Sequence, residues 1–267
     1  MHKPSSLKDY IVAFSIAGGL AIIFSLYLFT RQGYLLDAPA SIDTLAMPNK
    51  ILASVAMTLL AFTLLIGPLT RFFDRFDTWL GYRKEIGIVA GFLAVLHGLV
   101  SYYLLPLTFP KEWIEWSTPQ FGAGLIGAII LTALFAISFR KAIMALTASR
   151  WWFLQRFGLH VAIVATLAHV YIMKWDSWVL WFNESGPSTP ETIAPWLPGL
   201  AILTTLFITW VVIVRLYESL FLFRSLGVVP KEISMDPLLK ARGRRFFLFS
   251  LAIFILLKLI ILFRCIQ

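Results

Sequence analysis

The sequence predicts an all-α, polytopic membrane helix bundle with six core transmembrane helices and a seventh at the C-terminal end. Of its 267 residues, 59% are hydrophobic and only 14% are charged, and the mean hydropathy is +0.82. A soluble domain of this length could not bury so much apolar surface. The apolar residues also gather into runs of about 20, which is the length needed to cross a bilayer.

These runs predict seven membrane helices in succession. No long polar stretch remains between them for a soluble catalytic domain, and no glycine-rich nucleotide fingerprint follows a strand. We expect one membrane domain over 1–245, to which 246–267 adds a transmembrane or interfacial helix. The predicted helices cover roughly 10–30, 51–69, 86–107, 121–139, 157–174, 197–217 and 246–264.

The first and the last apolar runs each have a feature that affects how they are interpreted. The first run follows a short basic lead without a small-residue cleavage site, so we expect a retained helix and not a signal peptide. Lys258 interrupts the seventh run six residues before its end. It can extend to the outer interface, or it can be a buried functional lysine. The single cysteine, Cys265, excludes an intrachain disulfide and a cysteine-rich metal site.

Positive charge predicts the orientation of the bundle. With the N-terminus inside, seventeen lysines and arginines lie in inner segments and five in outer ones. Such an excess marks the cytoplasmic side, and seven spans place the C-terminus outside. The net charge of +9 comes from these short loops. It therefore indicates membrane orientation and not a nucleic-acid partner.

Two histidines lie at matching depth in two predicted helices. His97 is eleven residues after Ile86, and His169 is twelve residues after Phe157. At about 1.5 Å of rise per residue, both imidazoles lie about 16–18 Å from the inner end of their helices. An ionisable residue at this depth is costly and suggests a functional site. Two neutral imidazoles facing one another in a helix bundle suit a haem iron.

Both histidines share a helix face with small residues, which leaves room for a flat macrocycle but also permits close helix packing. The alternative is therefore that both histidines are hydrogen-bonded core residues. The small residues are Ala90, Ala94 and Ser101 beside His97, and Gly158, Ala162, Ala165 and Thr166 beside His169.

Another histidine and several basic residues belong to the inner side. His160 precedes His169 by nine residues. It therefore points to the opposite helix face about 13 Å lower, and cannot bind the same iron. It is either a hydrogen-bonding residue or part of a flavin or quinone pocket. Arg83, Arg150 and Arg156 are either ordinary positive-inside residues or an anion site for flavin phosphate, which suits guanidinium geometry.

Two stretches carry a resemblance to a known family. LLIGPLTRFFDRFDTWLGYRKEIGIVAGFLAVLHGLVSYY (64–103) and GLIGAIILTALFAISFRKAIMALTASRWWFLQRFGLHVAIVATLAHVY (124–171) resemble helices two to five of the ferric-reductase-like transmembrane domain. The sequence looks closest to the haem-binding membrane subunit of the bacterial periplasmic methionine sulfoxide reductase system. His97 and His169 match ligand positions of that family. The family's earlier fifth-helix histidine is replaced here within Leu154-Gln155-Arg156.

The resemblance implies a six-helix bundle in the bacterial cytoplasmic membrane, with the N-terminus in the cytoplasm and one haem b. The chain would be the electron-transfer membrane subunit of an oxidoreductase. Electrons would come from a quinol, a bound flavin such as FMN, or a cytoplasmic flavin reductase. They would leave to an outer-side acceptor protein or to ferric iron. The outer connection 175–196, rich in Trp, Pro, Ser and Thr, is a candidate docking surface.

Two other functions fit the same pattern. One is a quinol-oxidising cytochrome b subunit of a different respiratory complex. It needs a titrating side chain near the haem, and His160 is the obvious inner candidate. The other is a cofactor-free transporter or assembly protein. Transporters usually show broken helices or inverted repeats, and neither is visible in this sequence.

Overall fold

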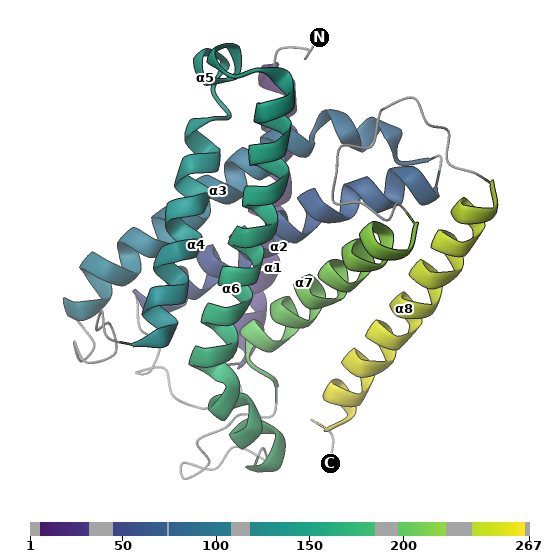
Figure 1. Ribbon diagram of the computed structural model, residues 1–267. Helices are drawn as coiled ribbons and strands as arrows, with labels where there is room; N and C mark the ends of the chain where they lie inside the picture. The colour runs from purple at the N-terminus through teal and green to yellow at the C-terminus, as the bar shows by residue number, and fades with distance from the viewer. Residues whose placement is uncertain are drawn as a thin grey trace.

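The computed structural model describes residues 6–31, 45–73, 75–107, 118–184, 197–222 and 237–264, and these ranges are helical without strands (Figure 1). Seven of the described helices are long and apolar enough to span a membrane, which confirms the predicted all-α, multi-pass architecture. They are α1 (Leu7–Phe29), α2 (Ala46–Phe72), α3 (Arg83–Leu99, extended by short helical turns to Leu107), α4 (Pro119–Ala136), α6 (Ala148–Glu184), α7 (Leu200–Tyr217) and α8 (Pro237–Arg264).

Local sequence signals account for where several helices begin. Ser6 caps α1: its hydroxyl accepts from the Asp9 backbone N–H at 3.3 Å, and the Asp9 carboxylate accepts from the Ser6 backbone N–H at 2.8 Å. This reciprocal pair satisfies two otherwise unpaired donors of the first turn. Pro119 opens α4, where a missing N–H costs nothing. Gly199 caps α7.

The helix α2 forms the centre of the bundle. Most of its side chains are buried, whereas α1 and α8 direct most of theirs outward. On its two sides α2 packs against α3 and α7, and α4 packs extensively against α6. Because α3 also packs on α4, the order α7, α2, α3, α4, α6 describes the main path of helix contacts. The core follows this path and is made of aliphatic side chains with Phe72 at one end.

The C-terminal helix α8 packs on α7 and α2 (Figure 1). Its Phe254 ring stacks on Trp210 at 5.2 Å, and its Ser250 hydroxyl accepts from the Trp210 indole N–H at 3.1 Å. The helix begins at Pro237 and not at residue 246. Residues 237–245 contain four basic side chains and a glycine, which interrupt the apolar pattern, so a search for apolar runs does not find this part of the helix. Lys258 lies with its Nζ 4.9 Å from the Phe254 ring centroid.

The helix α6 is longer than predicted. Its 37 residues span about 55 Å, well beyond the 30 Å of a hydrocarbon core. Residues 175–184, expected as part of a loop, continue the helix. They contain neither proline nor glycine, and the first Gly-Pro pair comes only at 186–187. The rest of that predicted docking segment, 185–196, lies outside the described residues.

Candidate functional site: a histidine pair and a basic cluster

His97 lies near the end of α3 and is half-buried. Its Nδ1 is 2.8 Å from the side-chain oxygen of Asn49 on α2. An amide oxygen can only accept a hydrogen bond, so the imidazole Nδ1–H must donate. The neutral ring then carries its lone pair on Nε2, which is the form that binds a metal. The Asn49 amide nitrogen in turn donates to the Ser101 hydroxyl at 2.8 Å.

His169 on α6 is held in the same tautomer by a different kind of partner. Its Nδ1 is 2.7 Å from the backbone carbonyl oxygen of Gln120, in the first turn of α4. A carbonyl also only accepts, so Nδ1–H donates and Nε2 is again the free lone pair. Gly124 makes this approach possible, because a Cβ there would lie 2.8 Å from His169 Nδ1.

The two histidines lie at the same end of the bundle. Each is tied to the first turns of a neighbouring helix, His97 to α2 and His169 to α4. They are close enough for His169 to act electrostatically on His97. The histidines are carried by α3 and α6. Within the described ranges these two helices make little contact with each other, but both pack against α4. The structure therefore places both predicted histidines at one end of the bundle, on two helices that both pack against α4.

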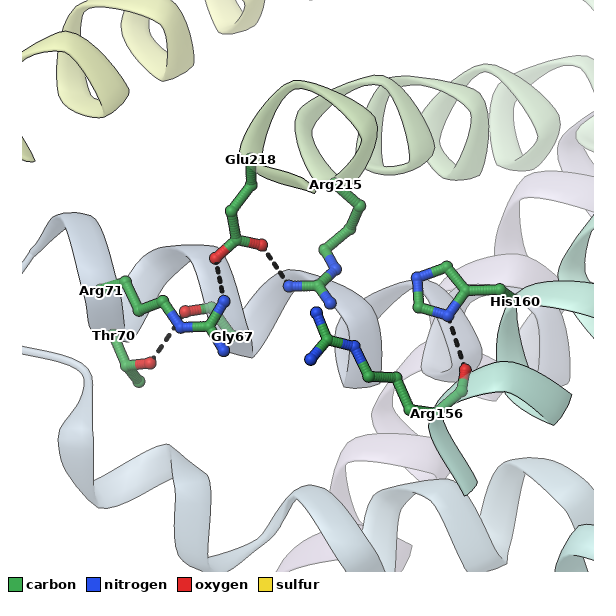
Figure 2. A network of polar contacts seen from close by, with 7 residues as sticks. All are labelled: Gly67, Thr70, Arg71, Arg156, His160, Arg215 and Glu218. Atoms are coloured by element: carbon green, nitrogen blue, oxygen red, sulfur yellow. Dashed lines mark hydrogen bonds and ion pairs between the residues drawn. The ribbon is translucent and has the colours of Figure 1, made fainter. Parts of the chain in front are cut away.

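A group of charges around the buried Glu218, here called the basic cluster, lies near the end of α2, far along this helix from Asn49 (Figure 2). Glu218, after α7, is 1% exposed and forms ion pairs with Arg71 at the end of α2 and with Arg215, whose side chain is 4% exposed. Arg156 of α6 points toward Arg215 in Figure 2. Arg83 interacts electrostatically with all of these residues. The basic cluster is Arg71, Arg83, Arg156, Arg215 and Glu218.

His160 lies beside the basic cluster (Figure 2). Its Nδ1 is 2.6 Å from the backbone carbonyl oxygen of Arg156, to which it donates. The nearby guanidinium groups of Arg83, Arg156 and Arg215 act on it electrostatically. Arg150, grouped with these residues in the sequence analysis, is exposed at the start of α6, where its backbone N–H contacts the Thr147 hydroxyl at 3.4 Å.

The sequence analysis missed the hydrogen-bond acceptors of the two histidines and the ion pairs of the basic cluster. Asn49 and Gln120 lie just before two of the predicted membrane helices. Nothing in the hydrophobic pattern linked them to histidines about 50 positions away. Arg71 and Arg215 were counted only as positive-inside charges. The spacing of Arg215 and Glu218 was a usable signal, because opposite charges three residues apart on a helix are neighbours. No group of three or more potential metal ligands occurs in the described ranges.

Known proteins provide a comparison for this arrangement. Residues 52–167 match the family described as ferric reductase like transmembrane component. The matched stretch includes His97 and His160 and ends two residues before His169. A curated relative, the metalloreductase STEAP2 of Mus musculus, is 27% identical over a stretch that covers 60% of this chain. The chain spans 40% of the length of that relative.

The comparisons and the fold agree on a coarse description. The chain is a multi-pass membrane protein, and residues 52–167, from α2 to about the middle of α6, are similar to the ferric reductase like transmembrane component.

Proposed function

We propose that this protein transfers electrons across the membrane through one b-type haem held between His97 and His169. The observation that carries this proposal is the matched pair of Nδ1–H tautomers. Each imidazole donates to an acceptor-only oxygen and keeps its Nε2 lone pair for a metal. A pair of histidines suffices for a haem, because the porphyrin supplies the other four iron ligands.

The residues around the pair fit such a group. Ala94 precedes His97 by three residues, Ala165 and Thr166 precede His169 by about one turn, and a Cβ added at Gly98 would meet no neighbouring atom within 4 Å. When bound with two imidazoles, a haem exchanges single electrons and has no open position for oxygen. The task of this chain is to orient the two rings, exclude water with apolar side chains and set the electrostatic environment.

The basic cluster supports a second part of the proposal, an anion site for the electron donor. Four arginines gather around the single carboxylate of Glu218, so positive charge exceeds negative charge within the basic cluster. Guanidinium groups bind phosphate oxygens through charge-assisted hydrogen bonds. The phosphate of FMN would bind there, with Arg83 and Arg156 as binding residues and His160 beside the isoalloxazine or a quinone ring. Arg150 is exposed at the start of α6, and we place it outside this site.

The direction of transfer follows from the predicted orientation. With the N-terminus in the cytoplasm of a bacterial cell, the basic cluster faces inward and the histidine pair outward. Electrons would arrive from a quinol, a bound flavin or a cytoplasmic flavin reductase, and would leave at the outer side. The curated relative is named a metalloreductase, which favours ferric iron as acceptor. The resemblance to the sulfoxide reductase subunit favours a periplasmic protein.

A reduced-minus-oxidised absorption spectrum of the purified protein tests the haem assignment. We expect a sharp low-spin b-type α band at about one haem per chain. His97→Ala and His169→Ala should each abolish haem retention, whereas His160→Ala should keep it, because His160 belongs to the other end of the bundle. Full haem content in either of the first two variants would refute the pairing. A colourless wild-type protein after haem supplementation would favour a transporter or assembly function.

Flavin fluorescence tests the anion site separately. We expect FMN to bind the purified protein, and Arg156→Gln to weaken binding about tenfold, the typical loss of one charge-assisted hydrogen bond. Arg150→Gln is the matched control, since this arginine lies on the same helix but is exposed. If FMN does not bind and a quinol reduces the haem in a manner sensitive to His160→Ala, the quinol-oxidising alternative is the correct one.

A further inference from the structure

The side chain of Asn49 is buried deeply for a polar group, with 4% of its surface exposed. A buried amide that lacks partners destabilises the fold. Asn49 avoids this cost because its oxygen accepts from His97 Nδ1–H and its nitrogen donates to Ser101. Both ends of the amide are therefore used to join α2 to α3 and to the helical turn that follows α3.

The acceptors of the two histidines differ in chemical kind. His169 donates to a backbone carbonyl, which no substitution at position 120 removes. His97 donates to a side chain, which a single substitution can remove, exchange or charge. An acceptor on the far nitrogen of a metal-binding imidazole fixes its orientation and raises its basicity as a ligand. Only the His97 side of the pair is open to adjustment in this way.

We propose that Asn49 is a positioning residue that fixes the tautomer and ring plane of His97 and through them sets the redox potential of the bound haem. The proposal rests on the haem function above and concerns a residue outside the predicted ligand set. A neutral amide oxygen polarises the Nδ1–H bond without adding charge. It therefore supports the ferric state less strongly than a carboxylate at the same place would.

Two substitutions of Asn49 separate orientation from packing. Asn49→Leu keeps a similar shape but removes the acceptor, whereas Asn49→Asp keeps an oxygen at the same position in either protonation state. We expect Asn49→Leu to weaken haem binding about 10–100-fold, the typical effect of removing such a partner, and to raise the midpoint potential. Asn49→Asp should retain haem, with a potential equal to or below that of the wild type.

A control on the same helix accounts for general effects of disturbing α2. Thr58 is 6% exposed, and its hydroxyl donates only to the Ser54 carbonyl of its own helix, at 2.7 Å. Thr58→Val should therefore leave haem affinity and potential unchanged. In the haem-free protein, ¹⁵N NMR should report an Nδ1–H imidazole for His97 in the wild type and in Asn49→Asp. Asn49→Leu should show a mixture of tautomers.

The possible outcomes distinguish this inference from the function on which it rests. A wild-type protein without haem would overturn the proposed function. A haem-containing wild type together with an Asn49→Leu variant of unchanged affinity, potential and tautomer would overturn the role of Asn49 alone. If Asn49→Asp loses haem as completely as Asn49→Leu, the acceptor is not what matters, and the inference also fails.

Discussion

Replacement of Gly124 by alanine should displace the His169 ring. The added Cβ would lie 2.8 Å from Nδ1, 3.2 Å from Cε1 and 3.4 Å from Cγ. To restore ordinary contact, the ring must retreat by about 0.6 Å, which moves Nδ1 away from the Gln120 carbonyl. The hydrogen bond would lengthen from 2.7 Å to about 3.3 Å, beyond the usual range for N–H···O. Overpacking costs about 1–3 kcal/mol, so we expect haem binding to weaken by about 5- to 150-fold.

Haem titration of the haem-free variant in detergent measures this effect, and electron paramagnetic resonance of the ferric form reports the changed ring orientation. Gly127→Ala is the matched control: it lies one turn further along the same face, and its Cβ would meet Thr166 Oγ1 at an ordinary 3.5 Å. It should bind haem normally and be slightly more stable, because alanine favours the helix. Equal haem affinity and equal spectra for the two variants would refute the assigned geometry of His169.

Three further predictions concern the rest of the bundle. Glu218→Gln removes the buried carboxylate that pairs with the buried Arg215 and the part-exposed Arg71, and should destabilise the protein by about 3–5 kcal/mol; a thermal unfolding midpoint equal to that of the exposed-site variant Asp176→Asn would contradict this. Gly243→Ala places a Cβ 2.5 Å from a Phe72 ring atom, so α8 should move from α2 at a cost of about 1–3 kcal/mol; an unchanged midpoint would show that the two helices do not pack closely there. A reporter fused to the C-terminus should be exposed on the outer, periplasmic side of the membrane, since seven spans separate it from a cytoplasmic N-terminus; a cytoplasmic reporter would mean that α8 does not cross the membrane.

The membrane helices were predictable because a bilayer imposes a length and an apolar character on any helix that crosses it. The same reasoning could not locate helix ends that lie outside the hydrocarbon core. The polar start of α8 before residue 246 and the continuation of α6 to Glu184 are both of this kind. Helix formation there depends on the absence of breakers and not on hydropathy.

The two histidines were predictable from depth alone, because an ionisable group in a membrane helix is rare enough to be noticed. Their partners were not, since Asn49 and the Gln120 carbonyl belong to other helices and carry no periodic signal. The basic cluster was predicted in part. The sequence analysis assigned Arg83 and Arg156 to a possible anion site, but Arg215 and Glu218 belong to the cluster because α7 packs on α2, which the sequence does not reveal. Gln155, where the resembling family has a histidine, instead donates to the Leu134 carbonyl and the Ser138 hydroxyl at the end of α4.

Because the two histidines donate to different kinds of acceptor, we expect the positions around them to vary to different degrees among relatives of this chain. Position 120 contributes only its main chain, so its side chain is free to drift. Position 124 has no such freedom, because any Cβ enters the space of the imidazole. Position 49 should be restricted to residues that offer an oxygen to His97. Natural variants that adapt the protein to acceptors of other potentials should therefore change at residue 49, while the His169 side stays constant.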